Sequence, residues 1–132
     1  MAQTTTTDTQ VFYPAHRYRD AAAAIEWLET AFGFERKEVH EGDDGTIIHA
    51  ELTFGPGVVM LGSERDDRYG PHVGHGWTYV VVDDPDALFE RASATGAEVV
   101  QKLIDTDYGS RDFSVRDPEG NIWSFGTYGP AR

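Results

Sequence analysis

The 132-residue sequence repeats one pattern of landmarks, and that repeat restricts the folds open to it. Three pairs recur 63 residues apart: Asp20 with Asp83, Gly33 with Gly96, and Gly57 with Gly120. The aspartates precede amphipathic segments, the first two glycines follow them, and the last two occupy expected turns. Self-similarity at a fixed spacing indicates that one structural unit occurs twice. We therefore expect an α+β fold of two tandem βαβββ modules that form a curved sheet cleft.

Two helices are predicted from apolar spacing and from signals at their ends. The first runs from Asp20, the expected N-cap, to Gly33, and its apolar residues follow the i, i+3, i+4, i+7 pattern. The second begins near Pro85, after Asp83 or Asp84, and stops at Gly96. Extended segments are expected at residues 11–19, 34–41, 46–54, 58–61, 77–82, 98–104, 112–116 and 121–127.

One domain is expected over residues 11–128, with module one at 11–62, a loop at 63–75 and module two at 76–128. The loop is polar and rich in glycine and proline, so it could cover a site between the modules. Residues 1–10 are polar and lack the features of a signal peptide, which predicts a disordered lead-in. Because no apolar run approaches the roughly 20 residues of a membrane span, we expect a cytoplasmic protein.

Composition and charge narrow the function classes. The chain has 11 Lys+Arg and 23 Asp+Glu, and this formal charge of −12 would repel nucleic acid and anionic lipid. The same charge favours a cationic or polycyclic basic ligand. The sequence has no cysteine, hence no disulfide framework and no thiolate chemistry. It also lacks a GxSxG elbow, a Walker loop and a dinucleotide motif, so acyl, phosphoryl and hydride transfer have no support.

Alternation along the strands predicts one core face and one mixed face in each module. On the strand at 46–54 the core face is expected to hold Ile48, Ala50, Leu52 and Phe54, and the mixed face Ile47, His49, Glu51 and Thr53. In the second module the core face is expected to hold Phe113, Val115, Trp123 and Phe125, and the mixed face Asp112, Ser114 and Arg116. Tyr13, Trp77 and Tyr79 can add aromatic rings to the mixed faces, which would suit a ligand cleft.

Three segments carry a resemblance to a known family: residues 18–35 (YRDAAAAIEWLETAFGFE), 47–62 (IIHAELTFGPGVVMLG) and 108–128 (YGSRDFSVRDPEGNIWSFGTY). They resemble the vicinal oxygen chelate superfamily of glyoxalases, extradiol dioxygenases and bleomycin-resistance proteins, across about 11–128. The resemblance implies paired βαβββ modules whose sheets curve into a cleft. It also implies a homodimer, which in some members exchanges modules between chains.

Metal-dependent members bind one divalent ion through side chains of the first and fourth strands of each module. By resemblance these positions correspond to Tyr13, Leu61, Trp77 and Ser124, none of which is a good ligand for such an ion. A displaced site would have to recruit His75, His49 or Glu51. The resemblance is therefore to the metal-free, bleomycin-resistance-like branch, with no metal and no cofactor.

The leading expectation is metal-free binding or sequestration of a small aromatic or polycyclic molecule, of the antibiotic-resistance type. The expected ligand-binding residues are Tyr13, Arg17, His49, Glu51, Trp77, Tyr79, Tyr108, Arg111 and Ser124. Some of these residues could have a structural role instead of binding a ligand. Tyr13 and Trp77 could fill the core, His49 could form a structural hydrogen bond, and Arg17 and Arg111 could form ion pairs. The alternative function is a glyoxalase-like lyase or isomerase that uses a displaced metal site, or His49 with Glu51. A third is a dimerising partner or sensor module.

Overall fold

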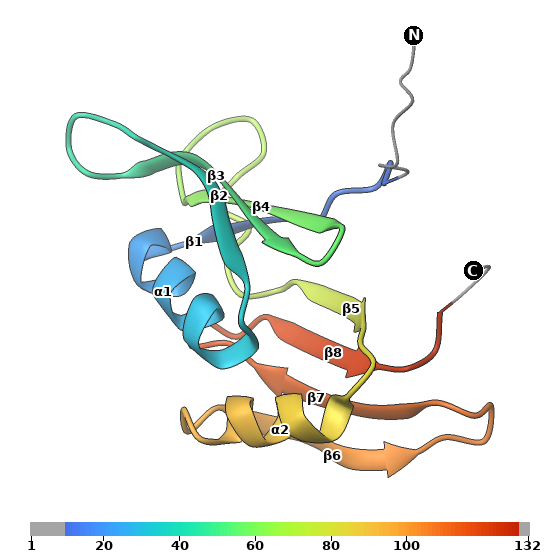
Figure 1. Ribbon diagram of the computed structural model, residues 1–132. Helices are drawn as coiled ribbons and strands as arrows, with labels where there is room; N and C mark the ends of the chain where they lie inside the picture. The colour runs from blue at the N-terminus through green and yellow to red at the C-terminus, as the bar shows by residue number, and fades with distance from the viewer. Residues whose placement is uncertain (1–9, 130–132) are drawn as a thin grey trace, which may run out of the picture.

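The computed structural model describes residues 10–129, which form eight strands and two helices (Figure 1). The first module contains β1 (Ala15–Tyr18), α1 (Ala21–Phe32), β2 (Glu35–Glu41), β3 (Ile47–Phe54) and β4 (Gly57–Ser63). The second contains β5 (Trp77–Val81), α2 (Pro85–Ser93), β6 (Glu98–Asp105), β7 (Arg111–Arg116) and β8 (Ile122–Gly126). The predicted α+β fold of two βαβββ modules is confirmed.

Each module forms its own four-stranded sheet. Sheet A has the order β1-β4-β3-β2, and sheet B has the order β5-β8-β7-β6. The first strand of each module pairs in parallel with the fourth, and the other pairs are antiparallel. Both sheets therefore have the same topology, as a duplicated unit requires.

The helix ends explain the spacing of the repeat. The Asp20 carboxylate caps α1 by accepting from the Ala23 N–H at 3.0 Å, and Gly33 ends it with a left-handed φ of 79°. In α2 the capping carboxylate belongs to Asp84, which accepts from the Ala87 N–H at 3.1 Å. The helix starts thus match at an offset one residue longer than the glycine landmarks.

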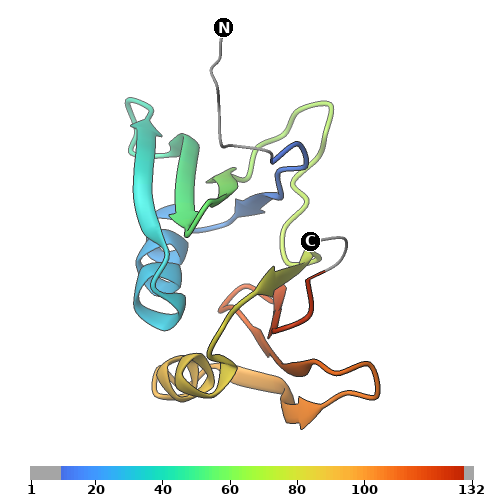
Figure 2. The same ribbon diagram turned by 45° about the vertical axis from the view of Figure 1, so that its right-hand side comes forward.

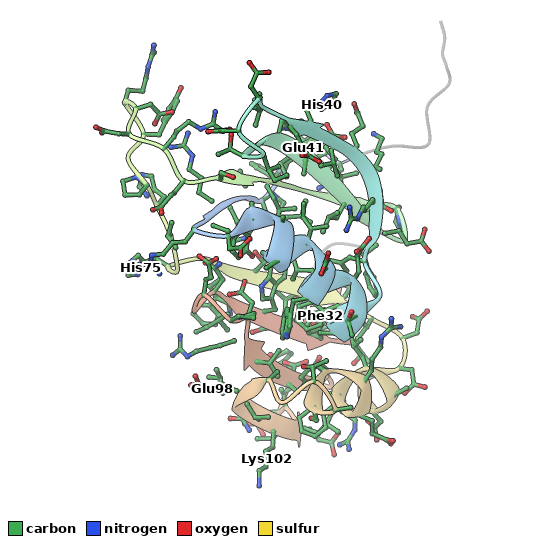
Figure 3. The ribbon with its side chains drawn as sticks, turned by 90° about the vertical axis from the view of Figure 1, so that its left-hand side faces the viewer. Phe32, His40, Glu41, His75, Glu98 and Lys102 are labelled. Carbon is green, nitrogen blue, oxygen red and sulfur yellow. The ribbon has the colours of Figure 1, made fainter. Side chains whose placement is uncertain are left out.

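The two modules share one core on the helix-covered side of their sheets. Phe32, at the end of α1 nearest sheet B (Figure 3), contacts the rings of Trp123 and Phe125 at 5.8 Å and 4.7 Å between centroids. Trp123 and Phe125 are buried, as predicted. The helices lie next to each other in Figure 2, and Arg91 of α2 donates to the carbonyl oxygens of Thr30 and Glu29 at the end of α1. The opposite side of each sheet carries no helix, and we call it the open face.

The strand β3 departs from strict alternation at its start. Ala50 and Leu52 are buried as predicted, but Ile47 is 3% exposed and Ile48 is 51% exposed, the reverse of the expectation. A register irregularity between His40 and Glu41, opposite Ile47, shifts the pleat at this point. The alternation rule therefore holds only from His49 onward.

The N-terminal boundary also differs from the expectation. The first strand begins at Ala15, so Tyr13 lies outside the sheet, and residues 1–9 of the expected lead-in lie outside the described residues. Gln10 exchanges two hydrogen bonds with the backbone of Val58 at 2.9 Å and 2.8 Å, so it is attached to β4. Among residues 10–129, neither helix is long and apolar enough to cross a membrane.

Candidate ligand-binding site

Trp77 is the most prominent side chain on the open face of sheet B. Its side chain is 75% exposed, and its indole N–H donates to the Ser124 hydroxyl oxygen at 2.9 Å. Ser124 lies 2.6 Å from the hydroxyl of Ser114 on the neighbouring strand β7. The ring is thus fixed at its polar tip while most of its surface stays open to solvent.

Three tyrosines extend the aromatic surface beyond Trp77. Tyr79 lies two residues along β5, on the same face, and its hydroxyl donates to the backbone oxygen of Tyr128 at 2.8 Å. The rings of Tyr108 and Tyr128 meet edge to face, with 5.3 Å between centroids. Partial burial is the main cause that raises the pKa of Tyr79, so its hydroxyl stays protonated and can donate.

A carboxylate lies among these rings. Asp112 accepts hydrogen bonds from the hydroxyls of Ser110 and Tyr108, the latter at 3.2 Å, and forms no ion pair within residues 10–129. Asp112 pairs with Gly126 on β8, where a Cβ atom would lie 2.6 Å from the Tyr79 hydroxyl and would collide with the Asp112 carboxylate. A glycine at 126 therefore makes room for Asp112 beside Tyr79.

The open face of sheet A carries a polar cluster instead. The His49 imidazole lies 2.9 Å from a Glu51 oxygen, and Lys37 lies 3.3 Å from the other Glu51 oxygen. These two partners, His49 first, lower the pKa of Glu51. Glu51 is consequently an ionised group held by two partners. His40, on the outer strand β2 (Figure 3), stacks on His49 with 6.2 Å between ring centroids.

Both predicted ligand-binding arginines are engaged in ion pairs. Arg17 donates to the two Asp67 oxygens at 2.9 Å and 2.8 Å and to the Gly70 carbonyl oxygen at 2.6 Å, which fastens the 64–76 loop to β1. Arg111 binds Asp86 of α2 at 2.7 Å and Asp105 at 3.1 Å. Because Arg111 alternates with Asp112, it lies on the helix side of sheet B, away from the open face that carries Trp77 and Tyr79.

A cavity of about 790 Å³ does lie between the modules, but on their helix side. Its walls come mainly from the core-facing side chains Phe34, Leu52, Val80, Leu88 and Trp123. Of the predicted site residues, only Tyr79 contributes to it. Neither His49 nor Trp77 lines this cavity. Of the predicted residues on the sheets, Arg17, His49 and Glu51 belong to sheet A, whereas Trp77, Tyr79 and Ser124 lie on the open face of sheet B.

The positions that hold a divalent ion in metal-dependent relatives of this fold do not fit one here. Leu61 is 3% exposed and belongs to the core, so the open-face position on β4 is Met60, which pairs with Ala15. The side chains of Ala15, Met60, Trp77 and Ser124 offer no imidazole and no carboxylate as a metal ligand. Within residues 10–129 no three His, Asp or Glu side chains converge as metal ligands, and His75 lies apart from His40, where the loop joins sheet B (Figure 3).

Three residues on the sheet B surface were not among the expected ligand-binding residues, although each contacts one of them. Asp112 contacts Tyr108, Ser114 contacts Ser124, and the backbone oxygen of Tyr128 contacts Tyr79. Alternation already assigned Asp112 and Ser114 to the mixed face, so that signal could have found them. Nothing local in the sequence indicates that the backbone oxygen of Tyr128 binds Tyr79.

The topology and the two open faces define a tandem βαβββ protein of the vicinal oxygen chelate type. Residues 11–125 match the model of the Glyoxalase/Bleomycin resistance protein/Dioxygenase superfamily. An uncharacterized protein of Mycobacterium bovis is 36% identical over 115 residues, which are 81% of this chain and 76% of that protein. The chain belongs to the Glyoxalase/Bleomycin resistance protein/Dioxygenase superfamily.

Solved structures agree with this assignment. TioX from Micromonospora sp. ML1 is 35% identical, with a TM-score of 0.74 over 88% of this chain and 98% of that one. A lactoylglutathione lyase from Agrobacterium tumefaciens has a TM-score of 0.67 over 92% of this chain and 95% of that one. Its identity of 21% makes this second similarity one of fold alone.

Proposed function

We propose that this protein binds a planar aromatic or polycyclic small molecule on the open face of sheet B and holds it without chemical change. Sequestration of this kind is the antibiotic-resistance type of function. One observation carries the proposal: Trp77 exposes 75% of its side chain while a hydrogen bond to Ser124 holds its polar tip. Large exposed aromatic surface has a cost in water, and a stacked ligand removes it.

The surroundings of Trp77 support the same ligand class. Tyr79 and Tyr108 are 38% and 62% exposed, and each is held by a hydrogen bond through its hydroxyl. Rings that are already oriented lose little conformational freedom when a ligand stacks on them. The surface therefore suits a flat, largely apolar molecule with few polar groups.

A positive charge on the ligand is favoured by Asp112. Its carboxylate lies among aromatic rings without a cationic partner in the described chain, and the net charge of −12 attracts cations over longer range. We therefore propose a cationic polycyclic ligand as the preferred class.

A homodimer is part of this proposal. Both open faces expose large apolar side chains, Ile48 on sheet A and Trp77 on sheet B, while the helix sides are already packed together within the chain. A second copy that brought its sheet A toward sheet B would enclose the ligand and shield both residues from water. His49 and Glu51 of the partner would then line the far wall.

Proflavine, a planar tricyclic cation, is a suitable probe for calorimetric titration. Trp77→Ala should lose about 1–3 kcal/mol of binding free energy, which is about 5- to 150-fold in affinity. Phe12→Ala is the matched control, because Phe12 is 90% exposed but lies outside both sheets. A folded Trp77→Ala variant that binds proflavine as tightly as the wild type would contradict the proposal.

Turnover distinguishes this proposal from a lyase or isomerase. Small molecules captured from a bacterial extract and incubated with fresh protein should be recovered unchanged, as judged by mass spectrometry. His49→Ala and Glu51→Gln should leave the recovered masses the same. Time-dependent conversion that disappears in either variant would establish an enzyme and reject sequestration.

A further inference from the structure

A second cavity, of about 360 Å³, lies on the open face of sheet A, between its strands and the loop that joins the modules. The strands supply Ile48, Met60 and Gly62 to its wall, and the loop supplies Arg65, Tyr69 and His72. The function proposed above uses Ile48 and His49 at the edge of this cavity, but it gives no role to Arg65 or to the loop. Its lining differs in chemistry from the aromatic surface of sheet B.

Arg65 is held against the strands by a specific contact. One of its terminal nitrogens donates to the Ile48 carbonyl oxygen at 2.9 Å. A Cβ atom on Gly62 would lie 3.2 Å from that same nitrogen, so the glycine lets the guanidinium approach the sheet. The bond to Ile48 uses one of the five N–H donors of the guanidinium, which leaves most of its donor capacity available.

The charges around the cavity are not balanced. Arg17 also lines it, but Asp67 neutralises Arg17 through two hydrogen bonds. The pKa of Asp67 is lowered to about 2, chiefly by the hydrogen bond from Arg17, with a smaller effect of the Arg65 charge. Arg65 forms no ion pair within residues 10–129, and no aspartate or glutamate is among the lining residues there. The described arginines that lie on strands all bind a carboxylate, whereas the loop residue Arg65 does not: they are Arg17, Arg36, Arg111 and Arg116.

We propose that this cavity binds the oxyanion group of a small organic molecule, a carboxylate or a phosphate, with Arg65 as its cationic partner. The forked donors of a guanidinium match the two oxygens of a carboxylate or two oxygens of a phosphate. His72 lines the same space and supplies a further ring nitrogen. The Tyr69 ring provides an apolar wall for the organic part of the ligand.

Calorimetric titration at low salt tests the proposal with three probes of one shape: benzoate, phenyl phosphate and the neutral analogue benzamide. Benzoate or phenyl phosphate should bind, and benzamide should bind at least about tenfold more weakly. The comparison of the first two identifies the preferred oxyanion. Arg65→Gln should reduce the affinity for the better anion by about tenfold or more.

Lys102→Gln is the control, because it also removes one positive charge but lies on β6 of sheet B, away from this cavity (Figure 3). It should change anion affinity by less than about twofold, the size expected of a screened surface charge. Gly62→Ala gives a second approach, since its Cβ would press on the Arg65 guanidinium while the charge is retained, and it should weaken anion binding less than Arg65→Gln does.

Three results would each overturn the inference. Benzoate and benzamide could bind equally well, neither anion could bind, or a folded Arg65→Gln variant could keep the wild-type anion affinity. The test of this anion site is independent of the test of the aromatic site on sheet B. Trp77→Ala should leave anion binding in this cavity unchanged, and Arg65→Gln should leave proflavine binding on sheet B unchanged.

Discussion

At the scale of single residues, Asp117 links elements that the sequence separates by about a hundred residues. It is 5% exposed and accepts hydrogen bonds from the Tyr18 hydroxyl at 2.6 Å, the Asn121 amide at 3.1 Å and the Trp123 indole at 3.1 Å. The Tyr18 contact joins β1 of the first module to a turn of the second. Burial, followed by the Asp117 charge, raises the pKa of Tyr18, so it remains a donor.

Asp117→Asn should therefore destabilise the fold. An asparagine side chain has one oxygen that accepts and one NH2 group that only donates, so some of the buried groups that donate to Asp117 would lose their acceptor. We expect a loss of about 2–4 kcal/mol in the free energy of unfolding. Urea unfolding measures this loss. Asp107→Asn, at an exposed loop position, serves as the control and should change the free energy of unfolding by less than about 0.5 kcal/mol. Similar unfolding curves for the two variants would contradict the account.

His16 should make stability depend on pH. Its burial lowers its pKa below the ordinary value of 6.5, against a smaller opposing effect of Asp117. The unfolded chain therefore takes up the proton more readily than the folded chain, and stability should fall as the pH drops through about 6.5. His16→Gln should show a smaller loss between pH 7.5 and 5.5, measured by urea unfolding, while His72→Gln should keep the wild-type loss. Equal losses in wild type and His16→Gln would contradict this assignment.

At the scale of elements, the start of α2 offers a clean comparison of neighbouring residues. Asp84 accepts from the Ala87 N–H, whereas the preceding residue Asp83 makes no such cap. Asp84→Ala should cost about 1 kcal/mol of unfolding free energy, the usual value of an N-cap. Asp83→Ala should cost much less, and the two thermal unfolding curves provide the measurement. The opposite order would show that the helix begins one residue earlier.

Elements were predictable from sequence where local rules decide them. Both helices and the burial of Trp123 and Phe125 follow from periodicity and end signals, because the helix-covered faces demand apolar side chains. The exchange of Ile47 and Ile48 did not follow, because a register irregularity depends on the neighbouring strand. The helix-side position of Arg111 follows from alternation with Asp112, but the expected strand began at residue 112 and so left Arg111 out.

At the scale of the whole molecule, the duplicated topology was predictable and the position of the site was not. A repeat reveals which unit occurs twice, but not which sides of the two units pack together. Contacts such as Phe32 with Phe125 decide that the helix sides meet. This packing leaves Trp77 and His49 on separate open faces of one chain.

The proposed homodimer gives a prediction at the same scale. Sedimentation equilibrium should report twice the 14.7 kDa mass of the chain. Each copy carries a charge of −12, so moderate salt should strengthen the association by screening repulsion. Ile48→Asp should shift the equilibrium toward the monomer, while Phe12→Asp, at an exposed apolar residue outside both sheets, should not. A monomer at all concentrations would contradict this part of the proposal.

The three tryptophans allow a direct test of whether the ligand binds at Trp77 on the open face of sheet B, because each has one indole N–H signal in a nitrogen–proton correlation spectrum. Trp77 lies on the open face of sheet B, Trp123 lines the cavity between the modules, and Trp27 lies on α1. Titration with proflavine should move the Trp77 signal and leave those of Trp27 and Trp123 in place. Movement of the Trp123 signal with a stationary Trp77 signal would instead place the ligand between the modules and contradict the account.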